Sequence, residues 1–454
     1  MDLQNKKITV VGLGNSGIGS VLLLNKIGAI VSVTDCGSDD ALKKQAEILR
    51  KIYIDCEIGH HTEEFLDESE LFVISPGVCE SSLPVRYSKE NNIPIISELE
   101  LGYTFCKGKI IAVTGTNGKS TVVSLLGDML KTAGRKAIVC GNIGNSLSGE
   151  VAKINDKTTV VVEVSSFQLE RIIDFKPKIS IILNIAEDHL DRHIDFKNYA
   201  GLKKKIFKNQ KKDDFTILNF DDKNLKNLHK RGEIKSKILY FSTKKKVEGI
   251  FLEKDNIKVF LKNKERILFK LPKRKILGLH NIENILAASL AATLTGVRTG
   301  CIEKSIIEFI PLEHRLQNIA TIGGIQFIDD SKATNIDSTQ RALESTEAST
   351  VLIAGGKDKK LSYKEIFPIL KKKVKIVILI GETKKKMKEA FASFVPCIEC
   401  DTLPEAVIAA HKSASCGDIV LLSPMCSSFD MFKNYKARGE VFRESVKNLK
   451  NAKN

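Results

Sequence analysis

The residues best suited to chemistry form the run Gly-Thr-Asn-Gly-Lys-Ser-Thr at 115–121, directly after the apolar residues 110–113. An apolar run, a glycine-containing loop and a return to helical spacing are typical of a strand, a phosphate-binding loop and a helix. The two glycines let backbone N–H groups converge on anionic oxygens, Lys119 supplies a positive charge, and Ser120 is placed to ligate Mg²⁺. A turn without a ligand is the alternative, but such a turn has no need of Lys-Ser-Thr.

Two further strand ends carry groups that can hold a metal ion. The buried strand predicted over 160–163 ends on Glu163, and a carboxylate beside a phosphate loop commonly holds Mg²⁺ or an attacking group. The alternative is that Glu163 belongs to a helix-capping turn, Glu-Val-Ser-Ser. The next strand leads into Asn-Ile-Ala-Glu-Asp-His-Leu-Asp-Arg-His at 184–193, where His189 is the favoured ligand of a metal or phosphate.

The start of the chain contains a second phosphate-binding pattern. Residues 7–33 predict strand, glycine turn, helix and strand, and the turn reads Gly-Leu-Gly-Asn-Ser-Gly at 12–17. Asp35 follows at the end of the second strand, so the pattern is that of a dinucleotide-binding unit in its proper context. It predicts a phosphate at a helix N-terminus and a ribose or base near Asp35, without specifying nicotinamide.

The last part of the chain alternates predicted strands with helices, and four of these strands end in polar loops. The loops begin at Asp330, Lys357, Glu382 and Met425. Because the carboxyl ends of parallel strands lie at one edge of a sheet, the four loops should face that edge. The pattern predicts a doubly wound sheet.

The chain is therefore expected to be α/β with three domains. Residues 1–97 predict a Rossmann-like domain, 98–310 a central parallel-sheet domain with the phosphate loop, and 311–454 a C-terminal Rossmann-like domain. Short alternating segments over 234–277 predict hairpin strands at the rim of the central domain. A helix start follows at 278–284, where two asparagines share one face.

Composition limits the class of protein. The chain has 454 residues, of which 43% are hydrophobic and 28% charged, which suits soluble globular domains. No apolar run approaches the roughly 20 residues that span a bilayer, and no signal peptide is visible, so we expect a cytoplasmic protein. Lys and Arg outnumber Asp and Glu by 71 to 55. The lysines form short runs with few aromatic residues between them, which favours solvated faces over nucleic-acid binding.

Ten cysteines are scattered without a disulfide framework, as expected in a reducing compartment. Cys397 and Cys400 have C-x-x-C spacing and are followed by His411 and Cys416, so a zinc site is an alternative. The favoured interpretation is a strand end at the two cysteines and an ordinary amphipathic helix around His411.

Short motifs along nearly the whole chain resemble one known family, the Mur ligases of peptidoglycan precursor synthesis. The motifs are GTNGKST, GNIG, EVSSFQLE, NIAEDHLDRH, GLHNIENILAA, His314-Arg315, DSKATN, AGGKDKK and LLSPMCSSFDMFKNYKARG. The last three motifs, together with GLGNSG, resemble the branch that adds D-glutamate. The branch that adds diaminopimelate or lysine would be expected to show Asp-Asn-Pro-Arg, which is absent from the last domain.

The resemblance implies an ATP-dependent ligase that forms an amide bond. ATP would phosphorylate the carboxylate of UDP-N-acetylmuramoyl-L-alanine, and the amine of D-glutamate would attack the acyl phosphate. Both steps concentrate negative charge, so cations and N–H donors should supply most of the catalysis. The resemblance assigns catalysis to Lys119, Glu163, His189 and Lys203, and two Mg²⁺ sites to Ser120, Glu163, His189 and Lys203.

The same resemblance assigns the binding residues. ATP would contact Gly115, Thr116, Asn117, Gly118, Lys119, Ser120, Thr121, Asn281 and Arg315. The UDP substrate would contact Gly14, Asn15, Ser16, Gly17, Asp35 and Asn142. D-Glutamate would contact Lys332, Thr334, Lys359, Ser428 and Phe429. Because Arg315 and the phosphate loop belong to different predicted domains, catalysis should require the two to close.

At two positions the residue roles of the family cannot be transferred directly to this chain. The family carries a carbamylated lysine, and the spacing from Tyr199 selects Lys203, but Lys204 and Lys205 stand beside it. A solvated helix face is the alternative for all three lysines. After Asp35 the family often has a threonine or a basic residue, whereas this chain has Cys-Gly, which leaves the uracil contacts open.

Three other functions compete with this interpretation. Another Mur-type or folylpolyglutamate-type ligase would share the central and last domains. An NAD-dependent oxidoreductase would use the first glycine pattern but leave GTNGKST and Glu163 unexplained. A basic, ATP-driven nucleic-acid protein would show steep salt dependence. The favoured interpretation predicts small-molecule substrates only, a monomer, and neither membrane nor nucleic acid as partner.

Overall fold

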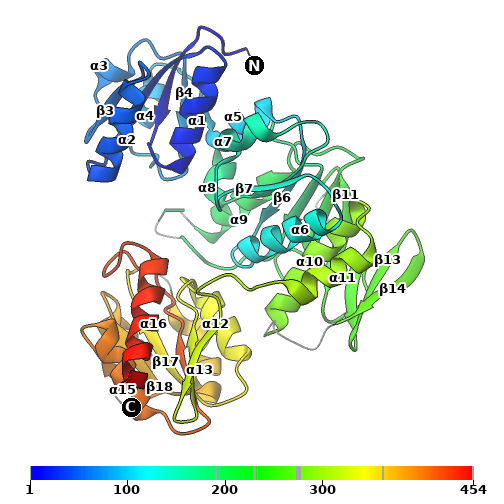
Figure 1. The fold of residues 1–454 in the computed structure, drawn as a ribbon, viewed down its shortest axis with the longest axis vertical. Helices are drawn as coiled ribbons and strands as arrows, with labels where there is room; N and C mark the ends of the chain where they lie inside the picture. The colour runs from blue at the N-terminus through cyan, green and yellow to red at the C-terminus, as the bar shows by residue number, and fades with distance from the viewer. Residues whose placement is uncertain are drawn as a thin grey trace. The chain divides into compact units, whose positions relative to one another are not determined.

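The computed structural model describes residues 2–189, 192–193, 195–228, 232, 234–271, 278–359 and 362–451. Residues 1–185, 200–271 and 285–308 form one compact unit, and residues 186–199, 272–284 and 309–454 form another. The first unit contains sheets of five and nine strands, and the second a sheet of six strands (Figure 1). Three separate α/β sheets agree with the predicted fold class. The predicted domain boundaries after residues 97 and 310 remain a prediction.

The first sheet is parallel throughout, with the order β3-β2-β1-β4-β5. Its strands are β1 (Lys7–Val11), β2 (Ile30–Asp35), β3 (Asp55–Ile58), β4 (Leu71–Ile74) and β5 (Ile95–Ser97). The helices between them are α1 (Asn15–Lys26), α2 (Asp40–Arg50), α3 (Glu63–Leu66) and α4 (Leu83–Glu90). Helices α1 and α2 pack on one face, and Val85 of α4 packs with Val11 and Ile74 on the other. The strand order reverses between β1 and β4, and sheets of this kind bind ligands at that point.

The central sheet has nine strands in the order β14-β13-β12-β11-β10-β9-β6-β8-β7. The strands are β6 (Lys109–Thr114), β7 (Ala137–Gly141), β8 (Thr159–Glu163), β9 (Ile179–Ile182), β10 (Phe215–Asn219), β11 (Lys237–Ser242), β12 (Gly249–Glu253), β13 (Asn256–Leu261) and β14 (Lys264–Lys270). The helices are α5 (Glu98–Phe105), α6 (Lys119–Thr132), α7 (Leu147–Glu150), α8 (Ser166–Glu170), α9 (Phe196–Lys204), α10 (Leu279–Leu294) and α11 (Thr299–Glu308). Strand β6 lies between β9 and β8, so the loop that follows it is flanked by two other strand ends.

The edge of this sheet differs from the predicted set of hairpins. Strand β11 pairs parallel with β10 and β12, whereas β12, β13 and β14 pair antiparallel. The close return of the chain depends on Gly249, which has φ of +136° and whose added Cβ would lie 1.9 Å from the carbonyl oxygen of Tyr240. The prediction is therefore right for the last two connections and wrong for the first. The predicted segment 272–277 lies outside the described residues.

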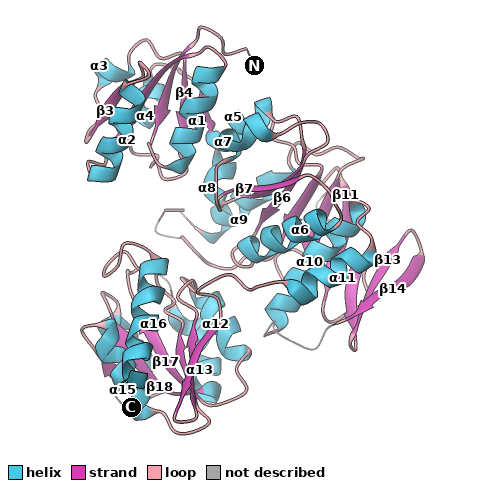
Figure 2. Ribbon diagram, viewed as in Figure 1, coloured by secondary structure: helices cyan, strands magenta, loops and turns pink. Residues whose placement is uncertain are grey.

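The third sheet has the order β15-β16-β20-β17-β18-β19 and is parallel except for β15. Its strands are β15 (Gln317–Ile322), β16 (Ile325–Asp329), β17 (Thr350–Gly355), β18 (Val374–Ile380), β19 (Cys397–Glu399) and β20 (Ile419–Leu422). The helices are α12 (Ile336–Glu344), α13 (Phe367–Lys373), α14 (Lys384–Phe391), α15 (Leu403–Ser413) and α16 (Tyr435–Asn451). Helices α12 to α14 share one apolar cluster with the strands, and α15 and α16 share another. Figure 2 shows the strands of this sheet flanked by helices such as α12 and α16. The sheet is therefore doubly wound, as predicted.

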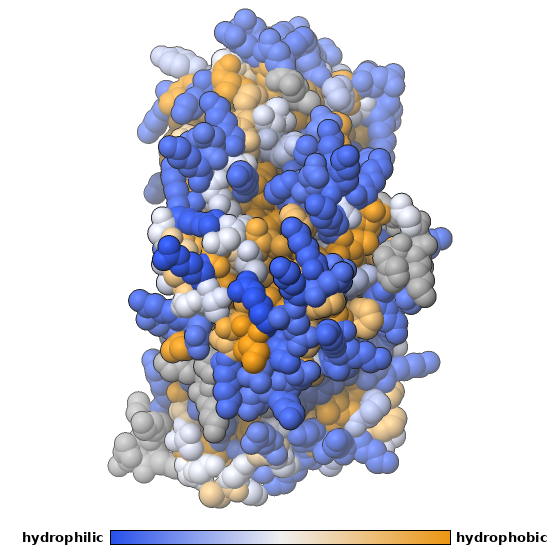
Figure 3. Space-filling model, turned by 90° about the vertical axis from the view of Figure 1, so that its right-hand side faces the viewer, coloured by the Kyte–Doolittle hydropathy of each residue, from blue (hydrophilic) through white to orange (hydrophobic). Residues whose placement is uncertain are grey.

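One face of the molecule is mainly polar. Hydrophilic side chains cover most of the face drawn in Figure 3, and apolar ones form small patches between them. Among the helices of the described ranges, none combines the length and the apolar character needed to cross a membrane.

Candidate active site

The phosphate loop leaves the carboxyl end of β6 and enters α6, as the sequence predicts. Gly115 has φ of +155° and Gly118, at the N-cap of α6, has φ of +87°, so both occupy backbone regions that favour glycine. All seven residues predicted to hold the ATP phosphates therefore lie in one continuous loop and first helical turn. The loop N–H groups and the positive end of α6 suit a polyphosphate.

Lys119 folds back over its own loop. Its Nζ donates to the carbonyl oxygens of Gly115 and Thr116, at 2.8 and 2.9 Å. Both acceptors are neutral carbonyls of the loop, and a phosphate oxygen would be a stronger, charged partner for the same ammonium. The geometry therefore places a cation over the loop, and contact of Lys119 with terminal phosphates remains a prediction.

Asn184 braces the phosphate loop from the neighbouring strand end. The backbone N–H of Asn117 donates to Asn184 Oδ1 at 2.8 Å, and Asn184 Nδ2 donates to the carbonyl of Asn117 at 3.1 Å. The N–H of Thr116 donates to the Asn184 carbonyl at 3.0 Å. Sequence reasoning missed this role, although Asn184 follows β9, the strand next to β6.

Glu163 lies beside the start of the phosphate loop, because β8 pairs with β6 in a register that sets Glu163 opposite Val113. Its side chain is buried, and Oε1 accepts a hydrogen bond from Asn142 Nδ2 at 2.9 Å. The other oxygen, Oε2, has no hydrogen-bond partner within the described part of the chain. A buried carboxylate oxygen in this position fits a cation such as Mg²⁺.

The capping role that competes with this interpretation of Glu163 belongs to another residue. Ser165 caps α8 through its side chain, and Gln168 completes the capping box by accepting from the Ser165 N–H at 3.0 Å. Glu163 therefore remains available for a ligand.

Of the three adjacent lysines at the end of α9, Lys203 reaches the phosphate loop. It is 2% exposed, and its Nζ donates to the carbonyl of Gly115 at 2.9 Å. Lys205 instead donates to the carbonyl of Glu170 at 2.7 Å. Burial of Lys203 against the loop favours it as the lysine that is carbamylated in the family. It also argues against the alternative that Lys203 lies on a solvated helix face.

The glycine loop of the first sheet is held by a carboxylate. Asp35 Oδ2 accepts from the N–H of Leu13 at 2.6 Å, and Oδ1 accepts from the N–H of Gly37 at 2.8 Å. An added Cβ on Gly17 would lie 1.9 Å from the Gly12 carbonyl oxygen, whereas one on Gly14 would meet nothing within 4 Å. The loop needs Gly17 for packing and leaves space at Gly14 for a ligand. Contact of Asp35 with a ribose remains a prediction.

The loops predicted to bind the amino acid come together at the carboxyl edge of the third sheet. Met425 N–H donates to the Ala333 carbonyl at 3.0 Å, and Lys357 N–H donates to the Ser427 carbonyl at 2.9 Å. These bonds join the loops that follow β16, β17 and β20. The joined loops carry Lys332, Thr334, Lys359, Ser428 and Phe429.

Lys359 forms a buried ion pair with Asp188, a residue that the sequence analysis did not single out. Lys359 Nζ lies 2.9 Å from Asp188 Oδ1, and each side chain is 7% exposed. Asn335 Nδ2 donates to Asp188 Oδ2 at 3.1 Å. Burial opposes ionisation of Asp188, but the charge of Lys359 prevails and holds the pKa of that carboxyl well below its ordinary value.

His189 follows Asp188 and belongs to the second compact unit. Its Nε2 lies 3.6 Å from Asp188 Oδ2. Glu163, Ser120 and Lys203 belong to the first unit, so their convergence with His189 on metal ions remains a prediction. The rest of the acidic cluster, at 190–191, lies outside the described residues.

Two residues of the second unit are predicted to contact the ATP base and phosphates. They are Asn281, in the first turn of α10, and Arg315. His280 lies near Arg315 and Arg341, and burial together with these two cations lowers its pKa to about 4. Burial raises the pKa of Asp330 to about 7, although a hydrogen bond from Ser423 and the charge of Arg315 oppose that shift. Arg315 thus lies near both a second arginine and a carboxyl group, and its contact with phosphates remains a prediction.

The zinc alternative finds no support in the described residues. His411 stacks on Phe327, with ring centroids 6.2 Å apart, and Cys397 Sγ lies 3.4 Å from the Val395 carbonyl oxygen. No group of three or more His, Cys, Asp or Glu side chains placed to hold a metal occurs among the described residues.

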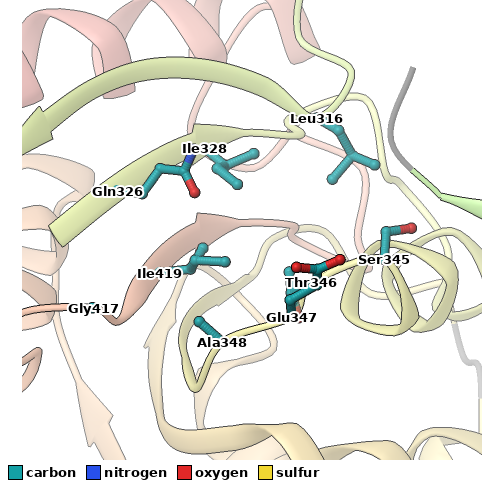
Figure 4. A pocket seen from close by; sticks show the side chains of 9 residues that line it. All are labelled: Leu316, Gln326, Ile328, Ser345, Thr346, Glu347, Ala348, Gly417 and Ile419. Carbon is teal, nitrogen blue, oxygen red and sulfur yellow. The ribbon is translucent and has the colours of Figure 1, made fainter. Parts of the chain in front are cut away.

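One open hollow of about 360 Å³ lies in the second unit (Figure 4). Its lining residues are Leu316, Gln326, Ile328, Ser345, Thr346, Glu347, Ala348, Gly417 and Ile419. None of them is a predicted site residue, although Leu316 directly follows Arg315 and its N–H donates to Asp330.

Comparison with known proteins agrees with the fold and the loops. Three family models match: "Mur ligase MurD-like, N-terminal domain" at 6–97, "Mur ligase middle domain" at 113–292 and "Mur ligase, glutamate ligase domain" at 314–426. The chain belongs to the Mur ligase family.

Similar curated proteins specify a branch of this family. A protein of Koribacter versatilis is 41% identical over 99% of both chains, and one of Caldanaerobacter subterraneus is 42% identical over 99% of this chain and 100% of its own. Both are named UDP-N-acetylmuramoylalanine--D-glutamate ligase.

Solved structures support the fold. The UDP-N-acetylmuramate-alanine ligase of Thermotoga maritima has a TM-score of 0.60 at 19% identity and covers 97% of this chain and 99% of its own. A pseudomurein peptide ligase of Methanothermus fervidus has a TM-score of 0.61 at 18% identity, covering 98% of this chain and 100% of its own.

Proposed function

We propose that this chain joins D-glutamate to UDP-N-acetylmuramoyl-L-alanine at the expense of ATP, in peptidoglycan precursor synthesis. The observation that carries the proposal is full-length similarity, at about 40% identity, to several proteins named for this reaction. The phosphate loop with Lys119, and the cationic and hydroxyl side chains on the loops of the third sheet, are the groups that such a reaction requires.

The proposed chemistry has two steps. A carboxylate oxygen of the alanyl group attacks the γ-phosphorus of ATP, the bond to the β-phosphate oxygen breaks, and ADP leaves. The amine of D-glutamate then attacks the carbonyl carbon of the acyl phosphate, loses a proton and expels phosphate. Lys119 and the loop N–H groups would hold the phosphates in line for the first step. Lys332, Lys359 and Ser428 would hold the two carboxylates of the amino acid for the second.

The proposal includes Mg²⁺ at two sites. Ser120 and Glu163 would hold one ion, and His189 and a carbamylated Lys203 the other. Bound Mg²⁺ would neutralise charge on the transferring phosphate. The orphaned Oε2 of Glu163 and the burial of Lys203 against the phosphate loop support these assignments. We also propose three domains with boundaries after residues 97 and 310, and a monomer that acts in the cytoplasm, where ATP is available.

The test is mass analysis of the product formed from ATP, UDP-N-acetylmuramoyl-L-alanine and a panel of amino acids. We expect a gain of one glutamyl residue with D-glutamate, and phosphate release only when both substrates are present. A product containing another amino acid would move the chain to another branch of the family. A nicotinamide absorbance change, or phosphate release stimulated by nucleic acid, would support the rival functions.

A further inference from the structure

Arg438, in the first turn of α16, is the largest of the fully buried side chains in the described structure, with 1% exposure. Its guanidinium is a planar group whose N–H donors are fixed relative to one another, here called the fork. It donates three hydrogen bonds. Nε donates to Ser331 Oγ at 3.0 Å, Nη2 donates to the Ser331 carbonyl at 2.8 Å, and Nη1 donates to the Cys426 carbonyl at 3.1 Å. Burial lowers the pKa of Arg438 to about 10, so the group stays charged near neutral pH.

The guanidinium lies where three loops meet. Ser331 follows β16 and Cys426 follows β20, and these strands are neighbours in the sheet. Gly356, after β17, lies beside the same group, because an added Cβ there would lie 3.3 Å from Arg438 Nη1 and 2.3 Å from the Ser427 carbonyl oxygen. One side chain therefore bonds the loops after two adjacent strands and packs beside the loop after a third.

Each of these anchor points is close in sequence to a residue of the proposed amino-acid pocket. Ser331 precedes Lys332, Cys426 stands two residues before Ser428, and Gly356 stands three residues before Lys359. Because these segments are so short, a displacement of an anchor residue also displaces the pocket residue that follows it. Displacements of about 1 Å at a reacting centre can cost on the order of a hundredfold in rate.

We infer that Arg438 is the positioning residue of the amino-acid pocket, holding the loops that carry Lys332, Lys359 and Ser428 at the spacing that the two carboxylates of the substrate require. The inference rests on the proposed function. A lysine cannot replace the fork, because its donors radiate from one nitrogen and cannot reach three acceptors in one plane.

The test compares Arg438→Lys and Arg438→Met with a matched control, Arg443→Met. Arg443 is on the same helix and contacts Gln317 and Glu440, outside the three loops. Steady-state kinetics give KM for D-glutamate, ATP and the UDP substrate separately. We expect both Arg438 variants to raise KM for D-glutamate about tenfold or more, with KM for ATP changed by less than about twofold. The control should leave all three near wild type.

A variant without Arg438 leaves buried acceptors unsatisfied and can fail to fold. In that case Ser331→Ala decides the question, because it removes one acceptor of the fork and keeps the carbonyl. It should raise KM for D-glutamate about threefold at an unchanged KM for ATP. Equal increases in all three KM values, or a lower melting temperature with unchanged KM values, would overturn the inference. If the wild-type protein uses another amino acid, the proposed function fails, and KM for that amino acid still tests Arg438.

Discussion

The two glycine loops of the first compact unit resemble each other in sequence, but a carboxylate holds one and a neutral amide holds the other. In the first sheet, the carboxylate of Asp35 accepts from two backbone N–H groups. In the central sheet, the amide of Asn184 both accepts from and donates to Asn117. A carboxylate uses loop N–H groups and adds negative charge, whereas an amide adds none. The loop proposed to hold a triphosphate is thus braced by a neutral group and contacted by two lysines.

The largest expected effect concerns the cation of the central loop. Lys119→Ala should reduce turnover by about a thousandfold or more, because it removes a positioned charge from the transferring phosphate. Phosphate release with all substrates present measures this loss. Turnover near that of wild type would show that the central loop takes no part in the mechanism. The comparison between the two glycine loops would then have no functional meaning.

The second lysine of the central loop should show a smaller and chemically reversible effect. Lys203→Ala should lower turnover about a hundredfold, and a short-chain carboxylic acid should restore part of it by replacing the carbamate. Lys205→Ala is the matched control, because Lys205 contacts the Glu170 carbonyl instead of the loop. Loss without rescue for Lys203, and loss with rescue for Lys205, would place the modified lysine elsewhere.

Replacing the neutral side chain of Asn184 with a charged one tests its role as the brace of the central loop. Asn184→Asp cannot donate to the Asn117 carbonyl and adds a negative charge beside the phosphates, so KM for ATP should rise about tenfold. KM for the UDP substrate should change little. Steady-state kinetics measure both constants. If Asn184→Asp binds ATP as well as wild type, the contrast between the two braces has no functional meaning.

The smallest effect is expected at the charged brace. Asp35→Asn places an amide N–H against one of the two backbone donors, so one of the two hydrogen bonds is lost, at a cost of about 1 kcal/mol. KM for the UDP substrate should rise about threefold to fivefold, while KM for ATP stays unchanged. A drop in turnover as large as that of Lys119→Ala would mean that the first loop takes part in phosphate transfer.

The sequence predicts contiguous features well, because their chemistry is local. The phosphate loop and its helix follow from glycine, lysine and serine within seven residues. Strands β16, β17, β18 and β20 are mainly apolar runs of four to seven residues, and the sequence predicts all of them. Strand β19 has only three residues, and the sequence analysis still places a strand end at its cysteines. The parallel pairing of β11 with β12 depends on one close approach at Gly249 and has no clear local pattern.

The site residues that escaped prediction act across long separations. Asn184 braces a residue 67 positions away, and Asp188 pairs with Lys359 across 171 positions. Arg438 reaches Ser331 across 107. Such pairings follow from the order of strands in a sheet, which one sequence does not specify. Asn184 could be suspected only once β9 is known to lie next to β6.

The buried pair of Lys359 and Asp188 implies that the proposed amino-acid pocket is already occupied, by a carboxylate of the protein itself. An arriving dicarboxylate has to displace a competitor that is tethered to the same chain and therefore never diffuses away. If the amino acid binds Lys359 as proposed, its binding is coupled to the segment next to His189, because Asp188 belongs to that segment.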